Sequence, residues 1–220
     1  MSPGAEGSKL DVIFDAFLRR LLGGLLLVRR REILLLMDHG LVDLFSADHR
    51  EHADVPTVGT PEYVALRQRD QARRHQATVL LARLTHPDGD DLYHAAWLFN
   101  HGDTPEDVRR AHELASRAAA LGNSKALWLS AASYDRWCMY RGLPQRYGTQ
   151  IVPDGTRFRV WDTDPTVTDE ERGLYHVPPL KEQEHRAAQQ TQVEPQPPMD
   201  NAPPWLQAAI ARWKASGAGA

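Results

Sequence analysis

The sequence lacks the features that identify many classes of protein. Its single cysteine, Cys138, excludes an internal disulfide and suits a reducing compartment, so we expect a cytoplasmic protein. Excess positive charge is also absent: the formal net charge is −3 at pH 7, which gives no electrostatic basis for binding nucleic acid. The sequence has no glycine-rich phosphate loop, no Gly-x-Ser-x-Gly motif and no Cys-x-x-Cys pair. We therefore predict no cofactor of these common kinds.

Long hydrophobic runs are absent as well. The most apolar stretch, residues 21–28, has arginines on both sides and is far shorter than the about 20 residues that a membrane-spanning helix needs. A signal peptide would carry its positive charges before the apolar segment and a small-residue cleavage site after it. The sequence therefore predicts neither a transmembrane segment nor a signal peptide.

Apolar residues instead recur at helical spacing, beginning with residues 1–28. They form one broad face made of Leu10, Ile13, Phe14, Phe17, Leu18, Leu21 and Leu22. Such a face requires burial, either against the main body or against a second copy, so a homodimer through this helix is one expected arrangement. A second helix is predicted over about residues 30–45, and the polar segment 46–59 is predicted to be a loop.

Local signals mark the elements that follow. Thr60-Pro61-Glu62 and Asp103-Thr104-Pro105-Glu106 each combine a capping residue, a proline and an acid, which is typical of a helix start. Alternating residues around the turn Pro153-Asp154-Gly155 predict a small hairpin. Residues 189–204, rich in glutamine and proline, are predicted to have no core, and residues 205–213 to form a short amphipathic helix.

These signals predict an all-α fold of stacked, tetratricopeptide-like helix pairs with a small C-terminal β-hairpin. A weak repeat, Ala95-Ala96-Trp97-Leu98 followed by Ala126-Leu127-Trp128-Leu129, supports the helix pairs. The expected organisation is an apolar N-terminal helix (1–28), a main helical domain with the hairpin (29–188), and a Pro/Gln-rich tail carrying the short helix (189–220).

One motif carries a family resemblance. Pro144-Gln145-Arg146-Tyr147-Gly148-Thr149-Gln150, preceded by Asp135-Arg136, resembles a motif of a bacterial domain-of-unknown-function family. The resemblance covers about residues 31–186 and implies a fold and a site, but no reaction. Residues 1–28, the tail and a short segment before Asp91 depart from the family pattern, which suggests a specialised member.

The same motif supplies the candidate site. A guanidinium, a phenol and amides beside an acid suit a polar ligand that carries a carboxylate or an amide, with Arg136 as a bidentate anchor. Asp135 and His101 are the predicted catalytic groups, which would transfer protons. The predicted ligand-binding residues are His94, Arg136, Gln145, Tyr147, Thr149 and Gln150. Alternatively, these side chains tie the hairpin to the preceding helix, and Tyr147 packs in the core.

The histidines have simpler explanations too. His94 and His101 lie on one helix face two turns apart, too far to share an ion, and His101 could instead serve as a helix cap. His49 and His52 match no established zinc spacing and fall in the predicted loop. No metal site is therefore predicted.

The predicted function is a pocket protein that binds, and in one version transforms, a polar small molecule, as a specialised-metabolism enzyme would. The sequence itself assigns no reaction. The alternative is a tetratricopeptide-like adaptor for protein–protein interaction, in which Trp205 and Trp213 would mark the interface with a partner.

Overall fold

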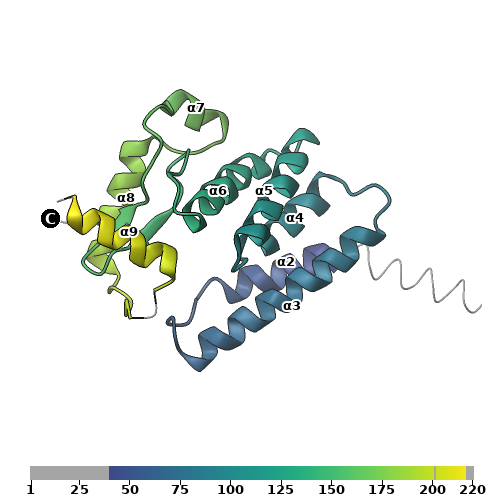
Figure 1. Cartoon of the computed structure of the whole chain (residues 1–220). Helices are drawn as coiled ribbons and strands as arrows, with labels where there is room; N and C mark the ends of the chain where they lie inside the picture. Colours follow the sequence, from purple (N-terminus) through teal and green to yellow (C-terminus); the bar gives the residue numbers. More distant parts are fainter. Residues whose placement is uncertain (1–39, 201, 217–220) are drawn as a thin grey trace, which may run out of the picture. The chain divides into compact units, whose positions relative to one another are not determined.

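Helices dominate the computed structural model, which describes residues 40–200 and 202–216 (Figure 1). The elements are α2 (Gly40–Glu51), α3 (Pro61–Arg83), α4 (Gly89–Asn100), α5 (Pro105–Ala120), α6 (Lys125–Tyr140), β1 (Ile151–Pro153), β2 (Phe158–Val160), α7 (Asp169–Leu174), α8 (Leu180–Val193) and α9 (Pro204–Ala215). The predicted fold class, helical with a small C-terminal hairpin, is confirmed. The predicted N-terminal helix and its dimer interface lie outside the described residues. Within those residues, no helix is both long and apolar enough to cross a bilayer.

The predicted helix starts are confirmed by their caps. The Thr60 hydroxyl accepts a hydrogen bond from the Tyr63 N–H at 3.2 Å, and the Thr104 hydroxyl accepts one from the Asp107 N–H at 3.1 Å. Proline follows each threonine, where its missing N–H costs nothing because the first turn of a helix has no internal acceptor for it. These local bonds fix where α3 and α5 begin.

Small side chains hold the central helices together. Helix α4 packs against α5, α5 against α6, and α3 against α4 (Figure 1). The buried residues at their centre include Leu92, Ala95, Ala96, Leu98, Ala111, Leu114, Ala115, Ala118, Ala126 and Leu129. Alanine at so many facing positions lets helix backbones approach closely, which gives the group a dense core.

Helix α2 corrects the prediction for residues 46–59. That segment was predicted to be a loop, but the helix continues through Glu51. Its inner side is ionic rather than apolar: Glu51 lies 2.9 Å from Arg73 of α3, and Asp48 lies 3.5 Å from the same guanidinium. An apolar periodicity was missing because charge pairs, not hydrophobic contacts, join this part of α2 to α3.

The predicted hairpin is confirmed, and α8 covers it. Strands β1 and β2 are antiparallel, with Val152 opposite Arg159. The Thr191 hydroxyl of α8 accepts a hydrogen bond from the Phe158 N–H at 2.8 Å, and Ala187 is buried nearby. The prediction that residues 189–204 have no core stays a prediction: α8 extends to Val193, so their first part is helical, but none of residues 189–193 is buried.

The predicted C-terminal helix also forms, and it docks on its own chain. Trp213 of α9 is 4% exposed, and its ring centroid lies 5.4 Å from that of Trp161. Its indole N–H donates to the Asp162 carboxylate at 2.7 Å. The tail helix thus belongs to a second core cluster with the hairpin, where Leu206 and Ala209 are also buried.

We expect Trp213→Ala to lower the free energy of unfolding by about 3–5 kcal/mol, because it removes a large buried ring and leaves a cavity. Urea denaturation followed by circular dichroism measures this change. The control is Leu174→Ala, at a position 72% exposed, which should change stability by less than about 0.5 kcal/mol. Equal effects of the two substitutions would contradict the docking of α9.

Candidate functional site

Asp135 organises the chain that follows α6. Its carboxylate accepts hydrogen bonds from the backbone N–H groups of Arg146 (2.8 Å), Tyr147 (2.9 Å) and Thr149 (3.0 Å), and from the Thr149 hydroxyl (2.8 Å). The side chain is fully buried. Burial raises the pKa of Asp135, whereas the hydrogen bonds favour its charged form. Both carboxylate oxygens are therefore occupied by the chain itself.

Two glutamines extend this arrangement to the hairpin. The Gln145 amide donates to the carbonyl oxygens of Trp161 (2.9 Å) and Gln150 (3.2 Å) and accepts from the Gln150 N–H (2.8 Å). The Gln150 amide donates to the Ala132 carbonyl at 3.0 Å and accepts from the Arg136 Nε–H at 3.1 Å. We call Asp135 together with residues 145–150 the latch, because they fasten the hairpin to α6.

A cavity of about 500 Å³ lies beside Arg136, the residue that follows Asp135 in α6. It is lined by residues from the segment after α2, from α3, from the end of α4, from α6 and from the start of α9: His52, Val55, Tyr63, Leu66, Arg67, His101, Gly102, Asp103, Arg136, Tyr140, Pro203 and Trp205. Pockets of roughly 300–1,000 Å³ hold small molecules. The cavity is therefore large enough for a metabolite-sized ligand.

Arg136 differs from the other arginines around this cavity. Its Nη1 donates to the Asn100 carbonyl at 2.6 Å and its Nε to Gln150, so two neutral acceptors fix the guanidinium. Among the residues that the structure describes, no carboxylate lies within ion-pair distance of it. Burial lowers the pKa of Arg136, and the nearby Arg67 adds to the effect. Within the part of the chain that the structure describes, the cavity wall thus carries a cation without a counter-ion.

Arg67, Arg73 and Arg74 of α3, in contrast, all have carboxylate partners. Arg67 bonds to Asp103 and, at 2.7 Å, to Asp70. Arg73 lies 2.5 Å from Asp70, and Arg74 lies 3.0 Å from Asp103. These contacts join α3 to the loop after α4 and neutralise the charges on that side of the cavity.

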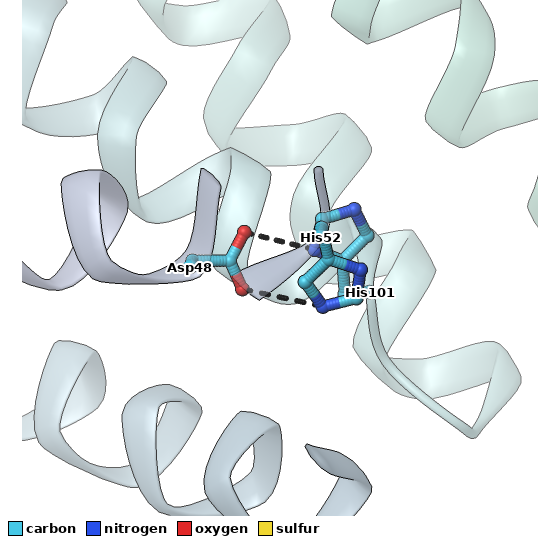
Figure 2. Close-up of side chains that lie close together, drawn as sticks. All are labelled: Asp48, His52 and His101. Carbon is cyan, nitrogen blue, oxygen red and sulfur yellow. Dashed lines mark ion pairs between the residues drawn. The ribbon is translucent and has the colours of Figure 1, made fainter. Parts of the chain in front are cut away.

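Asp48, His52 and His101 lie close together (Figure 2), and the two histidines line the cavity. His101 Nδ1 lies 3.0 Å from one Asp48 oxygen, and His52 Nε2 lies 3.8 Å from the other. The two imidazole rings are stacked, with centroids 3.9 Å apart. Burial lowers the pKa of His101, although Asp48 opposes the shift. The nearest acid to His101 is thus Asp48, which the sequence analysis did not associate with it.

The structure separates the predicted site residues. His101 and Arg136 line the cavity, whereas Asp135, Gln145, Thr149 and Gln150 belong to the latch and do not line it. Tyr147 is buried, with its ring centroid 4.7 Å from that of Tyr175. His94 packs beside Phe45, at 4.7 Å between centroids, and does not border the cavity. The predicted roles of all these residues in binding or catalysis stay predictions.

From the sequence, His52 was considered only as a partner of His49 in a metal site and set aside, and Asp48 and Arg67 were given no role at this site. Asp48 and His52 stand four residues apart, and the His52 N–H bonds to the Asp48 carbonyl at 2.9 Å, so the helical turn continues to His52. That spacing was the available signal, since residues four apart share one helix face. Because the segment was predicted to be a loop, this helical spacing was not used to place the two side chains together.

Comparisons with protein-family models, with curated proteins and with solved structures find no match for this chain. The resemblance to a bacterial family therefore stays a prediction.

We expect Asp135→Ala to lower the free energy of unfolding by at least about 3 kcal/mol, because each buried donor left unpaired costs about 1–3 kcal/mol. Urea denaturation at pH 7 measures the loss. Asp54→Ala, at an exposed position after α2, is the control and should be nearly neutral. If Asp135→Ala proved as mild as its control, the latch would not support the fold.

Asp70 should contribute to stability above pH 4 and lose that contribution in acid. Burial alone would raise its pKa, but hydrogen bonds from His52 and Arg73 hold the pKa at about 2, below the ordinary value of 3.8. A carboxyl whose pKa is lower in the folded state stabilises the protein above its unfolded pKa, by about 2 kcal/mol here. The stability difference between the parent and Asp70→Asn should therefore shrink by about this amount between pH 5 and pH 2. A difference independent of pH would contradict this account.

Proposed function

We propose that this protein binds a small anionic molecule, carrying a carboxylate or a phosphate group, in the cavity beside Arg136. The proposal rests above all on the guanidinium of Arg136, which borders the cavity and has no carboxylate partner among the described residues. A cation held away from bulk water without a counter-ion is unfavourable, and an anionic ligand would supply the missing charge.

The surroundings of Arg136 support an anchoring role. Nε and Nη1 are held by Gln150 and Asn100, so the plane of the guanidinium is fixed before a ligand arrives. A fixed guanidinium can present paired N–H groups to the two oxygens of a carboxylate or phosphate. The latch therefore does more than fasten the hairpin, because its Gln150 also orients the side chain that would hold the ligand.

Other cavity residues suit the rest of a small molecule. Tyr63, Tyr140 and Trp205 offer aromatic surface, and the Tyr140 hydroxyl already donates to the Gly102 carbonyl at 3.2 Å. The lining as a whole is nevertheless more polar than apolar, so these rings supply only part of the cavity surface. The proposed ligand is therefore a polar anion that can also carry an apolar or aromatic part.

The proposal extends to a reaction on the ligand, as expected of a specialised-metabolism enzyme. His101 and His52 both border the cavity and could transfer protons there, whereas Asp135 does not border it. We also propose a cytoplasmic location, which the single buried cysteine supports.

The adaptor alternative has less support. Trp213, one of the two tryptophans expected at a partner interface, is buried against Trp161 within the chain itself. Trp205 lies beside Tyr140 and lines the cavity. Both aromatic groups are thus accounted for by contacts within the protein, so they give no evidence for a partner surface.

We expect Arg136→Gln to weaken anion binding about tenfold to hundredfold, because hydrogen bonds to a charged group contribute about 1.5–3 kcal/mol. Isothermal titration calorimetry with inorganic phosphate and a panel of small aromatic and aliphatic carboxylates, each in the presence of a chelator, measures the change. Arg117→Gln, at an exposed position on α5, is the matched control and should bind like the parent.

The parent, Arg136→Gln and Arg117→Gln should all show cooperative thermal unfolding, so that lost binding is not lost folding. Absence of anion binding by the parent would refute the proposal. Equal binding by the parent and a folded Arg136→Gln variant would also refute it, since the anion would then be held elsewhere.

A further inference from the structure

The group formed by Asp48, His52 and His101 has an unusual composition for the wall of a cavity. One carboxylate oxygen and two imidazole nitrogens, each able to act as a donor atom, lie within 4.8 Å of one another. Asp48 lies in the last turn of α2 and His52 directly follows that helix, whereas His101 is the residue directly after α4. Figure 2 shows both rings placed against the same carboxylate.

In the part of the chain that the structure describes, Asp48 is buried without the hydrogen bonds that a buried carboxylate normally has. It is 1% exposed, yet neither of its oxygens receives a hydrogen bond among the described residues. Arg73, its nearest guanidinium, keeps Nε 3.5 Å away and directs its terminal nitrogens to Asp70 and Glu51. A buried carboxylate without donors is costly, so the structure holds an unsatisfied anion pointed at two imidazoles.

The contact between Asp48 and His101 is close but is not a hydrogen bond. Oδ2 and Nδ1 are 3.0 Å apart, which is ion-pair distance, yet neither atom has a hydrogen-bond partner among the described residues. Ligands of one tetrahedral zinc ion stand roughly 3.3 Å apart and point at the ion rather than at each other. Asp48 and His101 are therefore arranged more like two ligands of one metal ion than like the donor and acceptor of a hydrogen bond.

We propose that Asp48, His52 and His101 bind a divalent transition-metal ion of the zinc type. Two imidazoles and one carboxylate are a donor set that such ions accept, and three protein ligands leave a coordination position open. Because His52 and His101 also line the cavity, the open position faces the space that the anionic ligand would occupy.

To bind the metal ion, His52 must lose the proton on Nε2 and with it the hydrogen bond to Asp70. Its Nε2 lies 3.2 Å from Asp70 Oδ1, a contact made with the proton on Nε2, whereas metal ligation needs that nitrogen deprotonated. Asp70 would keep its bonds to Arg67 and Arg73, at 2.7 and 2.5 Å, and so remain satisfied. The stacked rings would also turn so that their lone pairs converge on the ion, and the cavity beside them offers the space.

The metal site deepens the proposed function without depending on it. An ion at this position would give the ligand a second anchor besides Arg136, and it would select anions that can coordinate a metal. His101 would then be a metal ligand and not a proton carrier. The two proposals can fail separately, because the anion titration described above is performed with a chelator and the metal titration uses no anionic ligand.

The test uses the full, untagged chain, freed of metal with a chelator and then exchanged into chelator-free buffer. Zn²⁺ binding is followed by calorimetry, and Co²⁺ binding by its visible absorption, which reports the coordination geometry. We expect one ion per chain, and at least a tenfold loss of affinity in both His52→Gln and His101→Gln. His49→Gln is the matched control, since His49 lies on the same helix but packs against Phe45 and Trp97.

Each outcome decides the proposal. One tight ion that both folded variants lose and the control retains supports it. No stoichiometric binding by the parent overturns it, as does equal binding by the parent and His101→Gln. If Asp48→Asn is also made, its melting temperature shows whether loss of the carboxylate charge affects folding. The two histidine variants decide the question even if that variant unfolds.

Discussion

The hydrogen bonds to the Asp135 carboxylate are the constraint on which the candidate site depends. Three backbone N–H groups and one hydroxyl converge on a fully buried side chain, which fixes the turn after α6. That turn places Gln150, and Gln150 holds the Nε of Arg136. The orientation of Arg136, which has no carboxylate partner among the described residues, is therefore set by a carboxylate that does not border the cavity. A mainly structural residue can in this way determine the geometry of a binding site.

The arginines around the cavity differ in whether they have a carboxylate partner. Arg67, Arg73 and Arg74 on α3 all have carboxylate partners, and their ion pairs join α3 to neighbouring segments. Arg136 has only neutral acceptors among the described residues, and Asp48 has no hydrogen-bond donor among them. Asp48 does lie within ion-pair distance of Arg73 and His101, whereas Arg136 has no acidic partner among these residues. This arrangement suits a site at which Arg136 meets an anion and Asp48 meets a cation.

The parts of the fold that sequence could predict are those that depend on neighbours along the chain. Thr60 and Thr104 cap their helices through residues three positions away, and Asp154 and Gly155 set the turn of the hairpin. The site was predictable only in part, for the same reason. His101 and Arg136 could be selected by type and position, but the partners that define their surroundings come from other segments. The end of α2 was missed because its buried side is ionic, and hydrophobic periodicity does not register ion pairs.

The sequence by itself determined the helical class, the starts of α3 and α5, the hairpin, and the short helix at residues 205–213. Each follows from short-range capping, turn chemistry or the period of apolar residues. Only the tertiary structure decided that Trp213 packs on Trp161, that Arg136 lacks a carboxylate partner within the described residues, and that Asp48 and His52 meet His101. These contacts join residues far apart in the chain. Whether such residues meet depends on how closely the alanine-rich helices pack, and that distance leaves no local pattern in the sequence.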